Sequence, residues 1–89
     1  MHLDIEIHNF YEHLVANQIA ALGLENEKSE DYLSDLCCIA LNTLPPRYIR
    51  HEVDMAFFLP QHERIEMEVQ VKKAVDRAME ILESSESAR

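Results

Sequence analysis

The sequence has few of the residues that form tight turns or bind phosphate through a loop. Glycine occurs once in 89 residues, where ordinary usage of roughly 7% would give about six. Tight β-hairpins depend on glycine for positive φ angles, so this scarcity argues against a many-stranded sandwich or barrel. It also excludes the glycine-rich loops of P-loop and Rossmann enzymes. Tryptophan is absent, and the length predicts one small domain with a thin core.

Cysteine is also scarce, and its spacing excludes two classes of protein. Cys37 and Cys38 are adjacent, which is strained for a disulfide and poor spacing for zinc ligands. We interpret them as two reduced, small apolar residues, with Cys37 inside an apolar stripe that disfavours its thiolate. The sequence contains no Gly-x-Ser-x-Gly or His-Glu-x-x-His motif. We therefore predict a protein that is not an enzyme and holds no cofactor or metal.

Positive charge is scarce, above all in the first half. The chain has 8 basic and 17 acidic residues, for a net charge of −9. Residues 1–46 contain one base against eight acids, and residues 47–89 contain seven against nine. Such a balance repels phosphate backbones, which predicts no non-specific nucleic-acid binding. A small anionic ligand at a local basic spot remains compatible with it.

Long apolar runs are missing as well. No run of 18 apolar residues is present, so we expect no membrane insertion. The first residues have neither the basic nor the apolar region of a signal peptide, which predicts a cytoplasmic location. An apolar content of 47% is nevertheless too high for a disordered chain.

Helical periodicity is what the sequence does contain. Apolar positions predict a first helix over residues 5–22, with Asp4 as its N-cap and Gly23 just after its end. A second helix is predicted over residues 30–43. Ser29 is its N-cap, and Pro45-Pro46 end it because the residue before a proline avoids the helical conformation.

The last predicted helix begins near Gln61, with Pro60 at its first position. Its main apolar face comprises Met67, Val71, Ala74, Val75, Ala78 and Leu82. Ile65 and Val69 lie on the opposite side. A helix that is apolar on two sides has two neighbours, one of which we expect to be a second subunit. The predicted domain covers residues 4–83, and residues 84–89 are expected to form a disordered tail.

Residues 47–59 connect the second and third helices. Val53, Met55, Phe57 and Leu59 alternate with polar or small residues, which predicts a short strand. A helical turn around Tyr48 is the alternative. A lone strand cannot satisfy its own backbone, so we expect it to pair with its copy in another subunit. The predicted fold class is mainly α, with three principal helices, an extended segment at 47–59 and a homodimeric state.

The strongest candidate for a ligand site lies at residues 44–50. Arg47 and Arg50 follow the rigid Pro45-Pro46 pair, and arginine forks bind phosphate in bidentate fashion. Tyr48 can stack on a base. In a two-fold dimer the site occurs twice, which suits a symmetric diphosphate. The alternative is a structural turn in which Tyr48 packs into the core and the arginines pair with nearby acids such as Glu52 and Asp54.

One further pair of residues has the spacing of metal ligands. His8 and Glu12 are four residues apart on the first predicted helix, so they lie on one face and could share a metal. A pair of this kind also arises commonly on helix surfaces. We interpret both as surface residues.

Residues 38–48, which read Cys-Ile-Ala-Leu-Asn-Thr-Leu-Pro-Pro-Arg-Tyr, resemble the central motif of the ComFB family of late-competence development proteins. Residues 9–15 are similar to the opening helix of that family, and residues 71–75 to its final helix. The resemblance implies a small helical domain that dimerises and is not an enzyme. Physical reasoning gives the motif residues Asn42, Leu44, Pro45 and Pro46 structural roles. Asn42 can bond free groups at the end of the second helix, Leu44 packs inward, the prolines end the helix, and Tyr48 anchors the exit of the chain.

The resemblance extends to function. Some relatives are receptors for cyclic dinucleotides that act on type IV pili and natural transformation, which implies a regulatory or adaptor module here. The alternative is a structural module that binds an unknown protein partner and no small molecule. Some members carry a cysteine-rich zinc loop before the second helix. Residues 25–31 contain no cysteine, so we do not expect the zinc site of those members in this protein.

Overall fold

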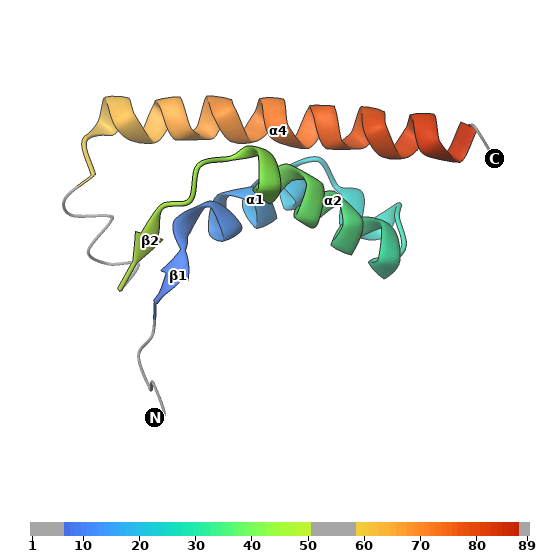
Figure 1. The fold of residues 1–89 in the computed structure, drawn as a ribbon, viewed down its shortest axis with the longest axis horizontal. Helices are drawn as coiled ribbons and strands as arrows, with labels where there is room; N and C mark the ends of the chain where they lie inside the picture. Colours follow the sequence, from blue (N-terminus) through green and yellow to red (C-terminus); the bar gives the residue numbers. More distant parts are fainter. Residues whose placement is uncertain (1–6, 51–58, 88–89) are drawn as a thin grey trace.

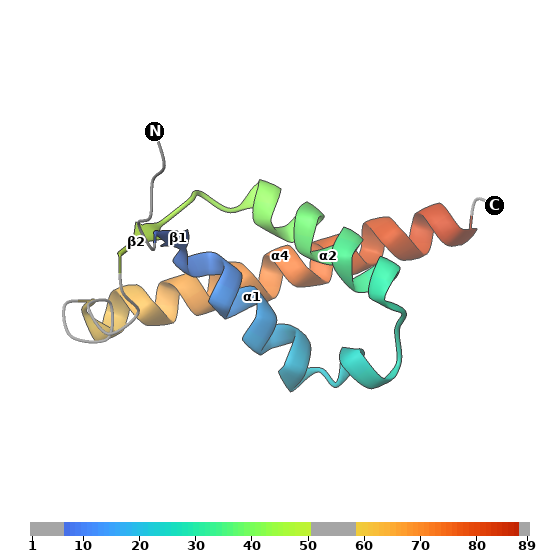
Figure 2. The same ribbon diagram turned by 90° about the horizontal axis from the view of Figure 1, so that it is seen from below.

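The computed structural model describes residues 7–50 and 59–87. The described elements, in chain order, are β1 (His8–Asn9), α1 (Phe10–Ala21), the 3-10 helix η1 (Leu24–Asn26), α2 (Glu30–Thr43), β2 (Tyr48–Ile49) and α4 (Gln61–Ser87). The long helix α4 lies across α1 and α2, which are both on the same side of it (Figure 1). Figure 2 shows the same crossing from below. The predicted mainly helical fold with three principal helices is confirmed.

Helix α2 begins and ends where the sequence predicts. The Ser29 side chain is the N-cap and accepts a hydrogen bond from the Tyr32 N–H at 3.1 Å. At the other end, Leu44 has φ −99° and ψ 141°, an extended conformation imposed by the proline that follows it. Local side-chain chemistry therefore sets both ends of this helix.

Helix α1 begins later than the sequence predicts. Its N-cap is Asn9, whose Oδ1 accepts from the Tyr11 N–H at 3.2 Å. The predicted N-cap, Asp4, lies outside the described residues. The predicted start at residue 5 is wrong for residues 7–9, because His8 and Asn9 form β1 and Ile7 is 58% exposed.

The end of α1 agrees with the prediction. Gly23 has a φ of +69°, the left-handed conformation that a residue just past a helix end adopts and that glycine tolerates best. Its N–H donates to the Ala20 carbonyl at 3.0 Å. The chain then enters η1 and buries Leu24 in the core. The connection between α1 and α2 thus contributes one apolar side chain to the core.

The extended segment pairs within the chain. His8 is opposite Ile49 and Asn9 is opposite Tyr48 in an antiparallel pair. Residues 48–49 therefore have a partner strand in their own chain, and the predicted pairing of the segment with its copy in another subunit stays a prediction. Tyr48 is exposed and Ile49 is buried, so the alternative in which Tyr48 packs into the core is wrong. Residues 51–58 of the predicted strand lie outside the described residues.

Helix α4 begins at Gln61, as predicted. The Pro60 carbonyl accepts from the Arg64 N–H at 3.1 Å, which places Pro60 just before the first helical position and not in it. Ile65 and Val69 are exposed on the side predicted to face a second neighbour. The helix continues to Ser87, past the predicted domain boundary at residue 83.

A single core joins the helices. Leu36, Val15 and Val75 are its largest fully buried side chains, contributed by α2, α1 and α4 in turn. Along α4 the buried positions are Met67, Val71, Ala74, Val75 and Ala78. They match the predicted apolar face. No helix in the described part of the chain is long and apolar enough to cross a membrane.

Candidate functional site

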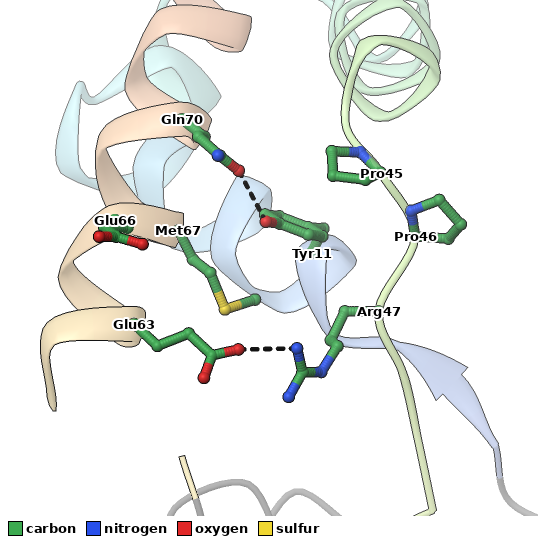
Figure 3. Close-up of a pocket in the computed structure, with 8 residues that line it drawn as sticks. All are labelled: Tyr11, Pro45, Pro46, Arg47, Glu63, Glu66, Met67 and Gln70. Carbon is green, nitrogen blue, oxygen red and sulfur yellow. Dashed lines mark hydrogen bonds and ion pairs between the residues drawn. The ribbon is translucent and has the colours of Figure 1, made fainter. Parts of the chain in front are cut away.

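A surface pocket lies between the chain after α2 and the N-terminal half of α4. Its volume is about 250 Å³. The lining residues come from α1, from the segment after α2 and from α4 (Figure 3): Tyr11, Pro45, Pro46, Arg47, Glu63, Glu66, Met67 and Gln70. The pocket therefore contains part of the basic motif predicted to bind a ligand.

The backbone of Arg47 is fixed at two points beside the start of α1. Its N–H donates to Asn9 Oδ1 at 2.9 Å, and its carbonyl accepts from the Phe10 N–H at 2.7 Å. The same Asn9 oxygen caps α1 through Tyr11. One amide side chain thus joins the first helix to the segment that follows the double proline. This positions the Arg47 side chain at the edge of the pocket.

The Arg47 side chain is paired with an acid from α4. Its Nη1 donates to Glu63 Oε1 at 2.7 Å, with the two side chains 48% and 33% exposed. Glu66 lines the same pocket. One arginine therefore faces two carboxylates. A phosphate that approached Arg47 would have to displace Glu63, whereas a ligand with N–H donors would find acceptors already in place.

Tyr11 forms the second polar contact of the pocket. Its hydroxyl donates to Gln70 Oε1 at 2.8 Å (Figure 3). Burial raises the pKa of Tyr11, the nearby Arg47 lowers it, and Glu63 raises it further, with a net upward shift. The hydroxyl is therefore a neutral donor at physiological pH. Because this bond occupies one atom of the Gln70 amide, the amide nitrogen remains a donor for other groups.

Only one of the three predicted ligand residues lines this pocket. That residue is Arg47, whereas Tyr48 and Arg50 are exposed and lie outside it. The acids predicted to pair with the arginines, Glu52 and Asp54, lie outside the described residues. The structure pairs Arg47 with the more distant Glu63.

The motif residues at the end of α2 take different positions. Leu44 is buried in the core, and Pro45 and Pro46 line the pocket. Asn42 is exposed. The side-chain hydrogen bond at this end of the helix comes from Thr43, whose Oγ1 donates to the Ala40 carbonyl at 2.8 Å.

Sequence reasoning missed five residues of the site: Asn9, Tyr11, Glu63, Glu66 and Gln70. Asn9 carries a signal that could have been found, because asparagine directly before an apolar periodic run is a favoured N-cap. The other four depend on how α1 and α4 pack together, which periodicity along one segment does not contain.

The alternative in which His8 and Glu12 share a metal assumes that both lie on one helix. His8 belongs to β1 and Glu12 to α1, so they do not share a helix face. Among the residues that the structure describes, no group of three or more histidine, cysteine or acidic side chains could hold a metal ion. Burial, with a smaller contribution from Cys38, raises the pKa of the half-buried Cys37 thiol, as its apolar surroundings predict.

Together, these features define a small helical domain whose pocket is built on an Asn-x-Leu-Pro-Pro-x-Tyr segment. The family model of the late competence development protein ComFB matches residues 8–86. The chain belongs to the ComFB family. No curated protein and no solved structure matches the chain.

Proposed function

We propose that this protein is a non-enzymatic regulatory module that binds a cyclic dinucleotide beside residues 44–50. The observation that carries the proposal is the position of Arg47, which the backbone holds at the edge of a pocket lined by the family motif. Glu63 and Glu66 add acceptors for the N–H groups of a base. The raised pKa of the Cys37 thiol, due mainly to burial, supports a role without covalent catalysis.

Isothermal titration against cyclic-di-GMP and cyclic-di-AMP tests the proposal. We expect one of the two to bind, and Arg47→Ala and Arg50→Ala each to weaken it. Arg64→Ala is the matched control, since Arg64 pairs with Glu68 and does not line the pocket. No heat from either nucleotide at tens of micromolar would contradict the proposal.

The module is proposed to act as a homodimer. Ile65 and Val69 support this, because they lie one turn apart and are 52% and 44% exposed on the side of α4 away from the core. Sedimentation over a range of concentrations should give a dimer that Val69→Glu weakens. Ile81→Glu is the matched control, as Ile81 is also exposed on α4 but points in another direction. A wild-type protein that stays monomeric at high micromolar concentration would overturn the dimer.

A second candidate function is a protein-interaction module that binds no small molecule. The ion pair between Arg47 and Glu63 favours it, since a structural arginine needs no ligand. In either case the family suggests a setting in competence, and we propose a link to type IV pili. The titration separates the two functions, because only the first predicts heat from a nucleotide.

A further inference from the structure

A second pocket lies on the other side of Pro45. It is an open surface pocket with a volume of about 360 Å³, lined by the end of α2 and the middle of α4. Pro45 and Gln70 line both pockets. The two pockets therefore form neighbouring parts of one groove, bounded by residues 43–47 on one side and by α4 on the other.

The two parts of the groove differ in charge. Glu63 and Glu66 outnumber Arg47 in the first. The second is lined by Lys73 and Arg77, and none of the residues that line it is acidic. Arg77 does pair with Glu80 at 3.2 Å, but both side chains are about two-thirds exposed, and such pairs contribute little. In a chain with a net charge of −9, this pocket concentrates positive charge.

The arrangement of the two cations suits a phosphate group. Lys73 and Arg77 are four residues apart on α4, so they project from the same face about 6 Å apart along the axis. Leu44 and Ala74 form a buried apolar floor beneath them. The Gln70 amide nitrogen adds a neutral donor, because its oxygen is occupied by Tyr11.

We propose that Lys73 and Arg77 bind the phosphate of a nucleotide ligand whose base occupies the pocket beside Glu63 and Glu66. The inference rests on the proposed function and deepens it by assigning the phosphate to a place other than Arg47. A ligand that joins a phosphate to a base with N–H donors matches both ends of the groove. A bare inorganic anion matches only the basic end, so it binds more weakly.

The neighbouring lysine provides a matched control. Lys72 is exposed on the same helix turn but does not line the basic pocket. We expect Lys73→Ala and Arg77→Ala each to weaken cyclic-di-GMP binding about tenfold in isothermal titration, through loss of a charge-assisted hydrogen bond. Lys72→Ala should change the affinity less than about twofold. If Lys72→Ala and Lys73→Ala weaken cyclic-di-GMP binding equally, the site is overturned, because the loss would then reflect the net charge of the protein and not contact with the phosphate.

A second probe keeps this test independent of the proposed function. Millimolar pyrophosphate, followed by backbone amide NMR of the full chain, should shift the amide signals of residues 43–44 and 70–77 in the wild type and not in Lys73→Ala/Arg77→Ala. If these shifts occur but no cyclic dinucleotide binds, the basic site stands and the proposed function fails. If the dinucleotide binds and only Arg47→Ala weakens it, the proposed function stands and the basic site fails. Absence of both signals overturns both.

Discussion

Two regions of this molecule are held together in different ways. In the core, α2 meets α4 through side chains such as Leu36 and Val75 that are completely buried. At the pocket, Arg47 joins the segment after α2 to Asn9 by a hydrogen bond and to α4 by an ion pair, and Tyr11 joins α1 to α4 by a hydrogen bond. Apolar burial is non-directional and large, whereas these polar contacts are directional and individually small. The core therefore sets stability, and the pocket contacts set where the arginine lies.

The largest effect should come from the core. Leu36→Ala should lower the free energy of unfolding by about 2–5 kcal/mol, because a fully buried side chain is lost and a cavity remains. Urea denaturation followed by circular dichroism measures this. Leu22→Ala is the control, since Leu22 is 43% exposed at the end of α1, and it should cost about 1 kcal/mol or less. Equal losses of unfolding free energy in the two variants would mean that burial in the core does not dominate the stability of the protein.

Asn9→Ala should have the next largest effect. It removes the N-cap of α1 and the acceptor for the Arg47 N–H together, so we expect a loss of about 1–2 kcal/mol. Amide hydrogen exchange should accelerate at Arg47 more than in the core. Asn17→Ala is the matched control, because Asn17 is exposed on the same helix. Uniform acceleration across the core and the pocket would contradict the separation of the two regions.

Tyr11→Phe should cost about 1 kcal/mol, the value of one neutral hydrogen bond. The ring stays buried and only the hydroxyl that donates to Gln70 is removed. Tyr48→Phe tests the same chemical change on a tyrosine that is 67% exposed, and its unfolding curve should match that of the wild type. A loss in Tyr48→Phe as large as in Tyr11→Phe would mean that burial does not distinguish the two sites.

The smallest effect should come from the ion pair at the pocket. A double-mutant cycle of Arg47→Ala and Glu63→Ala should give a coupling of about 0.2–1 kcal/mol, because both side chains are partly exposed. Added salt should reduce the coupling by screening. A coupling of several kcal/mol that salt leaves unchanged would show that this pair behaves like a buried one.

The same division explains what the sequence could predict. The bounds of α2 follow from Ser29 and from the two prolines, which act on their immediate neighbours. Gly23 at the end of α1 and the buried face of α4 follow from local rules in the same way. Each of these features depends on residues within one or two helical turns. Periodicity and capping therefore predict the core region well.

The pocket depends on contacts between distant residues, and there the predictions were less complete. Because Ile7 fits the helical periodicity, the sequence places the start of the first helix too early. Periodicity along one segment does not reveal that His8 and Asn9 pair with Ile49 and Tyr48. That pairing points Tyr48 outward. Proximity in the sequence points to Glu52 and Asp54 as partners of Arg47, but the structure pairs Arg47 with Glu63 of α4. Arg47 itself could be predicted as a residue of the candidate site from its charge and its position directly after the two prolines.

The double role of Asn9 also bears on the order in which the chain folds. The hydrogen bond from Arg47 to Asn9 joins residues 38 positions apart, and closing such a loop costs entropy before any contact compensates for it. The hairpin of α1 and α2 needs only the short turn at Gly23 and η1. We therefore expect this bond to form after the helices have assembled. Its late formation would make the pocket beside Arg47 the last part of the molecule to form.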